Sequence, residues 1–223
     1  MKINQIAVCA ALGFTSIAAL AQENTVRLGI ASVTIHSQSP DLSSNGPAFL
    51  TPQPAGITVG DATTLLLSYS RKINDQWDIE LAAGLPPSHN VYGTGRLAPF
   101  GMTAKVKQAG PTVFANYKFG AATDKFRPFI GAGVNFTRFY DGQSTASGNL
   151  ATGGPTKISL SDSVGLAAQI GASYKLDEHW SLCASIVTAK VKSDMTATTG
   201  SIERKTTIDF RPVVYTVALG YSF

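Results

Sequence analysis

Strict alternation of apolar and polar residues is the feature of this sequence that most restricts its fold. In residues 163–176 (SVGLAAQIGASYKL), every second residue from Val164 to Leu176 is apolar, and the residues between are small or polar. Residues 210–223 (FRPVVYTVALGYSF) alternate in the same way and end on Phe223. A two-residue period predicts β-strands with two chemically different faces, and no strong helical period competes with it. The sequence therefore predicts an all-β fold.

Several segments carry this pattern, and the connections between them alternate in length. Eight antiparallel strands are predicted at 24–35, 61–72, 77–86, 103–119, 126–140, 161–176, 179–193 and 204–223. Short connections lie at 72–76, 120–125 and 176–179, and long ones lie near 36–60, 87–102, 141–160 and 194–203. An even number of antiparallel strands suits a closed β-barrel, which has no exposed edge. Short periplasmic turns and long extracellular loops are typical of a transmembrane barrel in the outer membrane of a Gram-negative bacterium.

Residues 1–21 predict a cleavable signal peptide, which leaves 22–223 as a single barrel domain. Lys2 is the one charge in this stretch, an apolar run follows it, and Ala19-Leu20-Ala21 matches a small-residue cleavage site. No later apolar run approaches the ~18 residues of a transmembrane helix. The mature chain is therefore either a secreted soluble protein or a β-barrel.

The two faces of the strands admit two assignments. In a soluble barrel the apolar face points inward, whereas in a membrane barrel it meets lipid and the other face lines a narrow lumen. Small residues on the polar face and aromatic residues beside the short turns favour the membrane assignment. The aromatic residues are Tyr69, Trp77, Phe119, Phe126, Tyr174, Trp180 and Tyr221. We therefore expect outer-membrane lipid to surround the barrel.

Charged residues on the polar face predict a network inside the lumen, near its periplasmic end. These residues are Arg27, Lys72, Asp78, Glu80, Lys118, Arg127 and Lys175. Because an isolated buried charge is costly, we expect the basic side chains to surround the two carboxylates and fill the lumen.

Large apolar residues also occur on the polar face, and charge pairing does not explain them. They are Leu66, Phe114, Phe129 and Phe139. They fit two interpretations, since they could line a hydrophobic path or plug a closed barrel.

The sequence predicts no enzyme. His36, His89 and His179 fall in separate connections, and the Ser88-His89 pair has no ordered carboxylate partner. We therefore predict no catalytic residue, no metal site and no cofactor. The calculated pI of 9.1 comes from scattered charges, and no basic run indicates a nucleic-acid partner.

Four segments resemble the OmpW family of outer-membrane proteins. They are ANYKFG (115–120), KFRPFIGAGVNFTRFYD (125–141), LSDSVGLAAQIGASY (160–174) and the terminal VALGYSF. The resemblance extends over the mature chain, and FRPFIGAGVNFT is its most specific part. It implies an eight-stranded barrel that serves as a channel for passive uptake of small hydrophobic molecules. It is also consistent with a lateral exit into the bilayer.

Gly110 and Pro111 are the candidates for that lateral exit. Pro111 has no backbone N–H to donate to a β-ladder, and Gly110 weakens the strand beside it. The other interpretation is that Pro111 only kinks a strand near its outer end.

The chain terminus resembles the C-terminal signal that the outer-membrane assembly machinery recognises. Tyr221 and Phe223 are the residues that would carry this signal. The alternative function is a non-transporting surface barrel whose loops act as receptor or adhesion sites, with phage or bacteriocin as partners.

Overall fold

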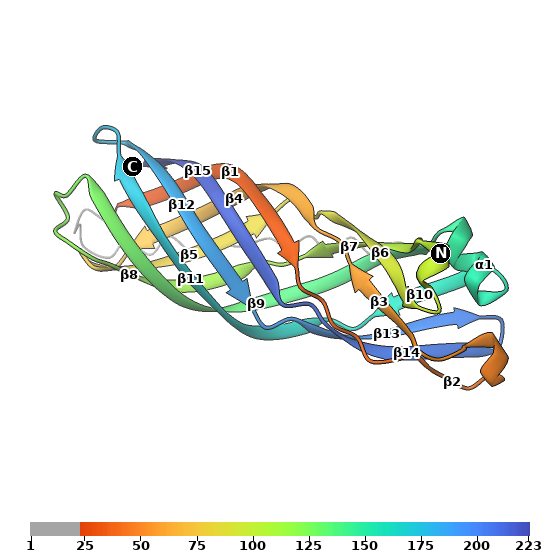
Figure 1. Cartoon of the computed structure of the whole chain (residues 1–223). Coiled ribbons are helices and arrows are strands. Elements are labelled where there is room, and N and C mark those ends of the chain that lie inside the picture. Colours follow the sequence, from red (N-terminus) through yellow and green to blue (C-terminus); the bar gives the residue numbers. More distant parts are fainter. Residues whose placement is uncertain (1–22) are drawn as a thin grey trace, which may run out of the picture.

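The computed structural model describes residues 23–223 and shows an elongated antiparallel β-barrel (Figure 1). The predicted signal peptide at 1–21 lies outside the described residues. Eight strands form a closed ring in one half of the molecule, which we call the membrane half. They are β1 (Asn24–Ile35), β4 (Ala62–Lys72), β5 (Trp77–Gly84), β8 (Thr112–Lys118), β9 (Phe126–Ser144), β11 (Ser163–Lys175), β12 (Trp180–Ala189) and β15 (Pro212–Ser222). Each strand pairs antiparallel with its neighbours in this order, and the predicted barrel is confirmed.

The last strand closes the ring on the first. Leu28 lies opposite Leu219 in the β1–β15 ladder. At the end of the ladder, Asn24 and Phe223 exchange two backbone hydrogen bonds of 2.9 Å each. These contacts leave no unpaired edge between the first and last strands of the ring.

The second half of the molecule, which we call the outer half, is also built mainly from strands. Its strands are β2 (Ser43–Ser44), β3 (Ala55–Val59), β6 (Ser88–Gly95), β7 (Met102–Ala109), β10 (Thr156–Leu160), β13 (Lys192–Thr199) and β14 (Ile202–Asp209). Short helices accompany them at η1 (Ala48–Leu50), η2 (Ala98–Phe100) and α1 (Ala146–Thr152). None of the described helices is long and apolar enough to cross a bilayer. Parts of the predicted long connections form paired strands, so strand pairing extends the barrel well beyond the membrane half (Figure 1).

Several predicted strands are interrupted where the two halves meet. The segment predicted at 103–119 is divided into β7 and β8 by Gly110 and Pro111, and the segment at 204–223 is divided into β14 and β15. In contrast, β9 runs without interruption through both halves and pairs with strands of each.

The chemistry of the inward and outward faces is exchanged between the two halves. In the membrane half, apolar side chains point outward, as shown by Ile170 at 60% exposure, whereas Asn116 is 2% exposed. In the outer half, Val106 and Ile208 are buried while Lys105 is exposed. Exposed apolar residues around a closed ladder suit lipid, and an apolar interior with a polar exterior suits water. The membrane assignment of the strand faces therefore agrees with the burial pattern.

Candidate functional site

Three hollow regions lie inside the barrel. The outer cavity, in the outer half, encloses about 850 Å³ of atom-free space. The middle cavity, in the membrane half, encloses about 1060 Å³. The periplasmic vestibule, among the short turns, encloses about 690 Å³. These volumes include space that is open to solvent.

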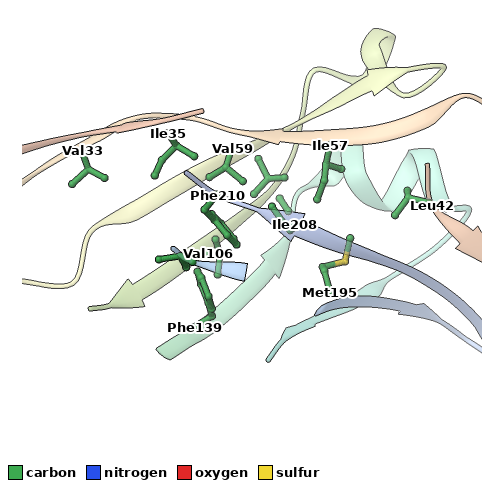
Figure 2. Close-up of a cluster of buried hydrophobic side chains, with 13 residues drawn as sticks. Val33, Ile35, Leu42, Ile57, Val59, Val106, Phe139, Met195, Ile208 and Phe210 are labelled. Atoms are coloured by element: carbon green, nitrogen blue, oxygen red, sulfur yellow. The ribbon is translucent and has the colours of Figure 1, made fainter. Parts of the chain in front are cut away.

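The wall of the outer cavity is predominantly apolar. Its side chains come from strands that are far apart in the sequence. The periodicity of each single strand therefore does not predict this cavity. Figure 2 shows several of them gathered between the strands. They include Leu42, Ile57, Val59, Val106, Met195, Ile208 and Phe210. Such a lining excludes hydrated ions and favours apolar solutes.

A layer of packed apolar side chains, which we call the septum, separates the outer and middle cavities. Phe139 and Phe210 stack with ring centroids 4.8 Å apart, and both belong to the same buried cluster as Val33 and Ile35 (Figure 2). Phe210 lines the outer cavity, whereas Val33 lines the middle cavity. The sequence prediction included Phe139 and missed Phe210, although the alternation of 210–223 places Phe210 on the inward face.

The middle cavity combines aromatic and polar walls. Leu66, Phe114 and Phe129 line it, as does the free thiol of Cys183. The positions predicted for these lumen residues are therefore inside the barrel, while their part in transport stays a prediction. Phe114 lies opposite Gly133 in the β8–β9 ladder, where a β-carbon would come within 2.8 Å of the Phe114 ring. The absence of that side chain gives the ring its place against the wall.

A charged and hydrogen-bonded layer, which we call the floor, closes the periplasmic side of the middle cavity. Arg27 pairs with Glu80 at 3.2 Å, and Lys118 pairs with Asp78 at 2.6 Å. The Asn116 amide joins the two acids by donating to Asp78 at 2.8 Å and to Glu80 at 2.9 Å. Arg27, Asp78, Glu80 and Asn116 are buried while Lys118 is partly exposed, and the low local dielectric strengthens the hydrogen bonds among the buried groups.

Gln169 completes the floor from the facing strand. Its amide donates to Glu80 at 3.1 Å and to the Asn116 carbonyl oxygen at 2.7 Å. The sequence prediction of the network missed Asn116 and Gln169 because it counted charges only. Their place on the polar face of long alternating segments is the signal that could have found them.

Three of the predicted basic residues do not surround the carboxylates of the floor, and this part of the predicted network is corrected. Lys72 pairs with Asp75 at 2.9 Å. Arg127 donates to the Asp75 carbonyl oxygen at 2.6 Å, and Lys175 donates to the Ala122 carbonyl oxygen at 2.7 Å. These cations stand at strand ends, so their long side chains reach the adjacent turns and bind them across the vestibule.

The wall of the barrel has a gap in its hydrogen-bond ladder between β5 and β8. Pairing of these strands ends at Ala82 and Thr112, and pairing of β6 with β7 begins at Ser88 and Lys107. Between these positions, one backbone hydrogen bond of 3.3 Å joins Gln108 to the Pro87 carbonyl.

The gap lies beside Gly110 and Pro111, but on one side only. On the opposite side, Phe136 of β9 donates to the Pro111 carbonyl at 3.0 Å. Because the N–H and carbonyl of one residue face the same neighbour in an antiparallel ladder, the donor that Pro111 lacks would face β9. Pro86, which also lacks an N–H, lies at the gap, separated from the end of β5 by Leu85 alone. Gly84 and Gly110 line the middle cavity, so this cavity extends to the gap.

Ionisable groups outside the membrane half are few in the barrel interior. His89 of β6 is buried, and its Nδ1 lies 2.8 Å from the Gly60 carbonyl oxygen. Its burial lowers the pKa of the imidazole, so His89 is neutral and donates from Nδ1. Among residues 23–223, no group of three or more His, Cys, Asp or Glu side chains is arranged to hold a metal ion.

Comparison with known proteins decides the family. The model of the OmpW family matches residues 22–223. The chain belongs to the OmpW family. Outer membrane protein W of Vibrio cholerae is 33% identical to it over 199 residues, which cover 89% of this chain and 87% of the relative. OmpW-family membership establishes a non-enzymatic protein of the Gram-negative outer membrane.

Solved structures agree with the OmpW-family fold. The crystal structure of OprG from Pseudomonas aeruginosa is similar with a TM-score of 0.81 and 29% identity, covering 90% of this chain and 95% of OprG. The dibenzothiophene metabolism operon protein DoxH of a Pseudomonas strain is 28% identical over 200 residues, covering 89% of this chain and 88% of DoxH.

Tyr221 and Phe223, the predicted assembly signal, lie at the end of the barrel that carries the short turns. Both rings are exposed on the outward face, and the Tyr221 ring stacks on His179. An outward-facing terminal aromatic is accessible to another protein before it meets lipid. Recognition by the assembly machinery stays a prediction.

Proposed function

We propose that this protein is an outer-membrane channel for passive uptake of small hydrophobic molecules, which leave the middle cavity sideways through the gap between β5 and β8. A solute would enter the outer cavity, pass the septum and reach the middle cavity. The floor would then stop it from continuing along the barrel axis. The gap offers the remaining way out, into the lipid that surrounds the barrel.

One observation carries this proposal: ion pairs bound the middle cavity below, and beside Gly84 and Gly110 the cavity reaches a stretch of wall where the β5–β8 ladder pairing has ended. An apolar solute gains nothing by displacing the Arg27–Glu80 pair, since this would leave buried charges unpaired. Lipid, in contrast, solvates it as well as the cavity does. The name of DoxH, which places that relative in a dibenzothiophene metabolism operon, agrees with an aromatic, apolar solute class.

A disulfide across the gap tests the route. If the register of Ala82 with Thr112 continues by two residues, Gly84 stands opposite Gly110. Gly84→Cys and Gly110→Cys are introduced together after Cys183→Ser removes the native thiol, with a short bis-maleimide as the alternative link. We expect the closed form to lose protein-dependent uptake of dibenzothiophene into proteoliposomes and, for the disulfide, reduction to restore it.

The matched control places the same link where the wall is already closed. Ala82→Cys with Thr112→Cys joins the same two strands, at positions that also line the middle cavity. Uptake that survives linking at 84 and 110 would refute the lateral route. Equal uptake with and without the protein would refute transport itself and favour the non-transporting surface barrel.

A further inference from the structure

Arg204 is a buried cation inside a predominantly apolar chamber. It lies on β14, is 3% exposed and lines the outer cavity. We propose that the outer cavity binds single-chain amphiphiles with a carboxylate head, and that the head pairs with Arg204 while the chain fills the apolar space. This inference rests on the proposed uptake function and names a solute class for it.

The hydrogen-bond partners of Arg204 are all uncharged. Its guanidinium donates to Thr51 Oγ1 at 3.1 Å, Thr199 Oγ1 at 3.2 Å, and the carbonyl oxygens of Leu50 at 3.4 Å and Thr152 at 3.3 Å. These contacts engage four of its five N–H donors but do not neutralise its charge. Burial lowers the pKa of Arg204, yet a guanidinium remains charged at physiological pH.

The floor shows how this same barrel treats another buried guanidinium. Arg27 has the Glu80 carboxylate at 3.2 Å as its counter-ion. A buried charge is normally paired because leaving it alone is costly. By comparison with Arg27, Arg204 lacks an anionic counter-ion. The space beside Arg204 is a cavity of about 850 Å³.

The position of Arg204 along β14 gives the site a direction. The buried face of this strand reads Arg204, Thr206 and Ile208, and Phe210 continues it just beyond the strand end. At about 3.3 Å per residue, this face extends for ~20 Å from the charge to the septum. A carboxylate at Arg204 would therefore place an unbranched chain along Ile208 and Phe210, with its tail directed at the septum.

Arg204 also has a structural role that the test must separate from binding. Its contacts join β14 to η1 at Leu50 and to α1 at Thr152. Loss of these contacts would disturb the structure of the outer half and would therefore weaken the binding of every solute, whatever its charge. A carboxylate-binding role, in contrast, must discriminate between two solutes that have the same chain and differ in charge.

The experiment compares decanoate with 1-decanol on the full mature chain in lipid nanodiscs at pH 7.5. In protein labelled with ¹⁵N-arginine, we expect the Arg204 Nε–H resonance to shift and saturate with decanoate and not with 1-decanol. Corrected for lipid partitioning, decanoate should bind about tenfold more tightly, as a charge-assisted hydrogen bond predicts. Arg204→Gln should abolish this preference, and Arg204→Lys should retain part of it.

Lys205→Gln is the matched control, because Lys205 follows Arg204 on β14 but its side chain is exposed on the other face of the strand. It removes one positive charge and should leave the preference unchanged. Equal binding of the two compounds by the native protein would overturn the inference, and so would an equal preference in Arg204→Gln. Dibenzothiophene uptake is measured in parallel: uptake without a carboxylate preference refutes this inference alone, whereas preference without uptake refutes the transport function alone.

Discussion

The rings of Phe139 and Phe210 stack at 4.8 Å, with 21° between their planes, at the level where the outer half of the barrel meets the membrane half. One ring comes from the uninterrupted strand β9 and the other from the junction between β14 and β15. The contact therefore joins the two halves and also separates two cavities.

Truncation of this stack should increase solute passage at the expense of stability. Phe210→Ala removes a ring that is 2% exposed, so we expect a loss of about 3–5 kcal/mol in the free energy of unfolding. We also expect faster uptake of dibenzothiophene per folded barrel, because the septum becomes thinner. Phe49→Ala is the control, since Phe49 is exposed in η1. Unchanged uptake in Phe210→Ala would show that the septum does not limit passage.

Removal of the Glu80 charge should destabilise the floor. In Glu80→Gln, Arg27 would remain buried without a counter-ion, at a cost of about 3–5 kcal/mol. The double replacement Arg27→Met with Glu80→Leu should be less damaging, because no unpaired charge remains. Urea unfolding followed by gel mobility of unheated samples measures both. For comparison, Lys107→Gln breaks an exposed 2.8 Å ion pair with Asp141 and should change stability by at most about 1 kcal/mol.

His89 should make the outer half less stable in acid. Its pKa is lowered in the folded protein, so the unfolded chain binds more protons as the pH falls below about 6.5. Stability should be constant with pH above this value. It should fall below it by up to ~1.4 kcal/mol per pH unit until the folded-state pKa is reached.

Hydrogen exchange of the β6 and β7 amides between pH 7.5 and 5 measures this effect. His89→Asn retains an N–H donor for the Gly60 carbonyl and should lose the pH dependence. His36→Asn, a replacement at an exposed position, should leave it intact. A native protein whose β6 amides are equally protected at both pH values, after correction for intrinsic exchange, would contradict the prediction.

Deletion of Phe223 should impair assembly before it impairs transport. The deletion removes both 2.9 Å hydrogen bonds with Asn24 and the terminal aromatic ring. Phe223→Ala removes the ring alone. Comparing the folded fraction in membranes at matched expression separates the contribution of the backbone hydrogen bonds from that of the ring. If the assembly machinery recognises the ring, both variants should show a defect. Normal assembly of both would refute the assembly signal.

The membrane half could be predicted because each of its strands meets two different environments. In 212–222, lipid selects Val217 and Leu219 while the crowded lumen selects Ala218 and Gly220, so the period appears in the sequence itself. The same logic placed Phe114 and Phe129 inside.

The outer half was harder to predict because its strands are short and rich in Ser, Thr and Gly, as in TATTG at 196–200. These residues indicate loops when each segment is considered alone. Here, pairing with neighbours decides the conformation: Thr196 lies opposite Lys205, and Ser159 lies opposite Thr196 on the other side. The outer cavity and the place of Arg204 in it depend on contacts between distant segments, which no local pattern contains.

Because β9 is continuous, its register in the membrane half and its register in the outer half are set together during assembly. Phe114 of β8 lies opposite Gly133, and Ala109 of β7 lies opposite Arg138, so both strands meet β9 at the same offset across the Gly110–Pro111 interruption. The register shifts farther out, between Lys105 and Lys107. A slip of one residue along β9 would invert the faces of both halves together. Insertion of β9 into the membrane therefore also selects which side chains of the water-exposed half will face its cavity.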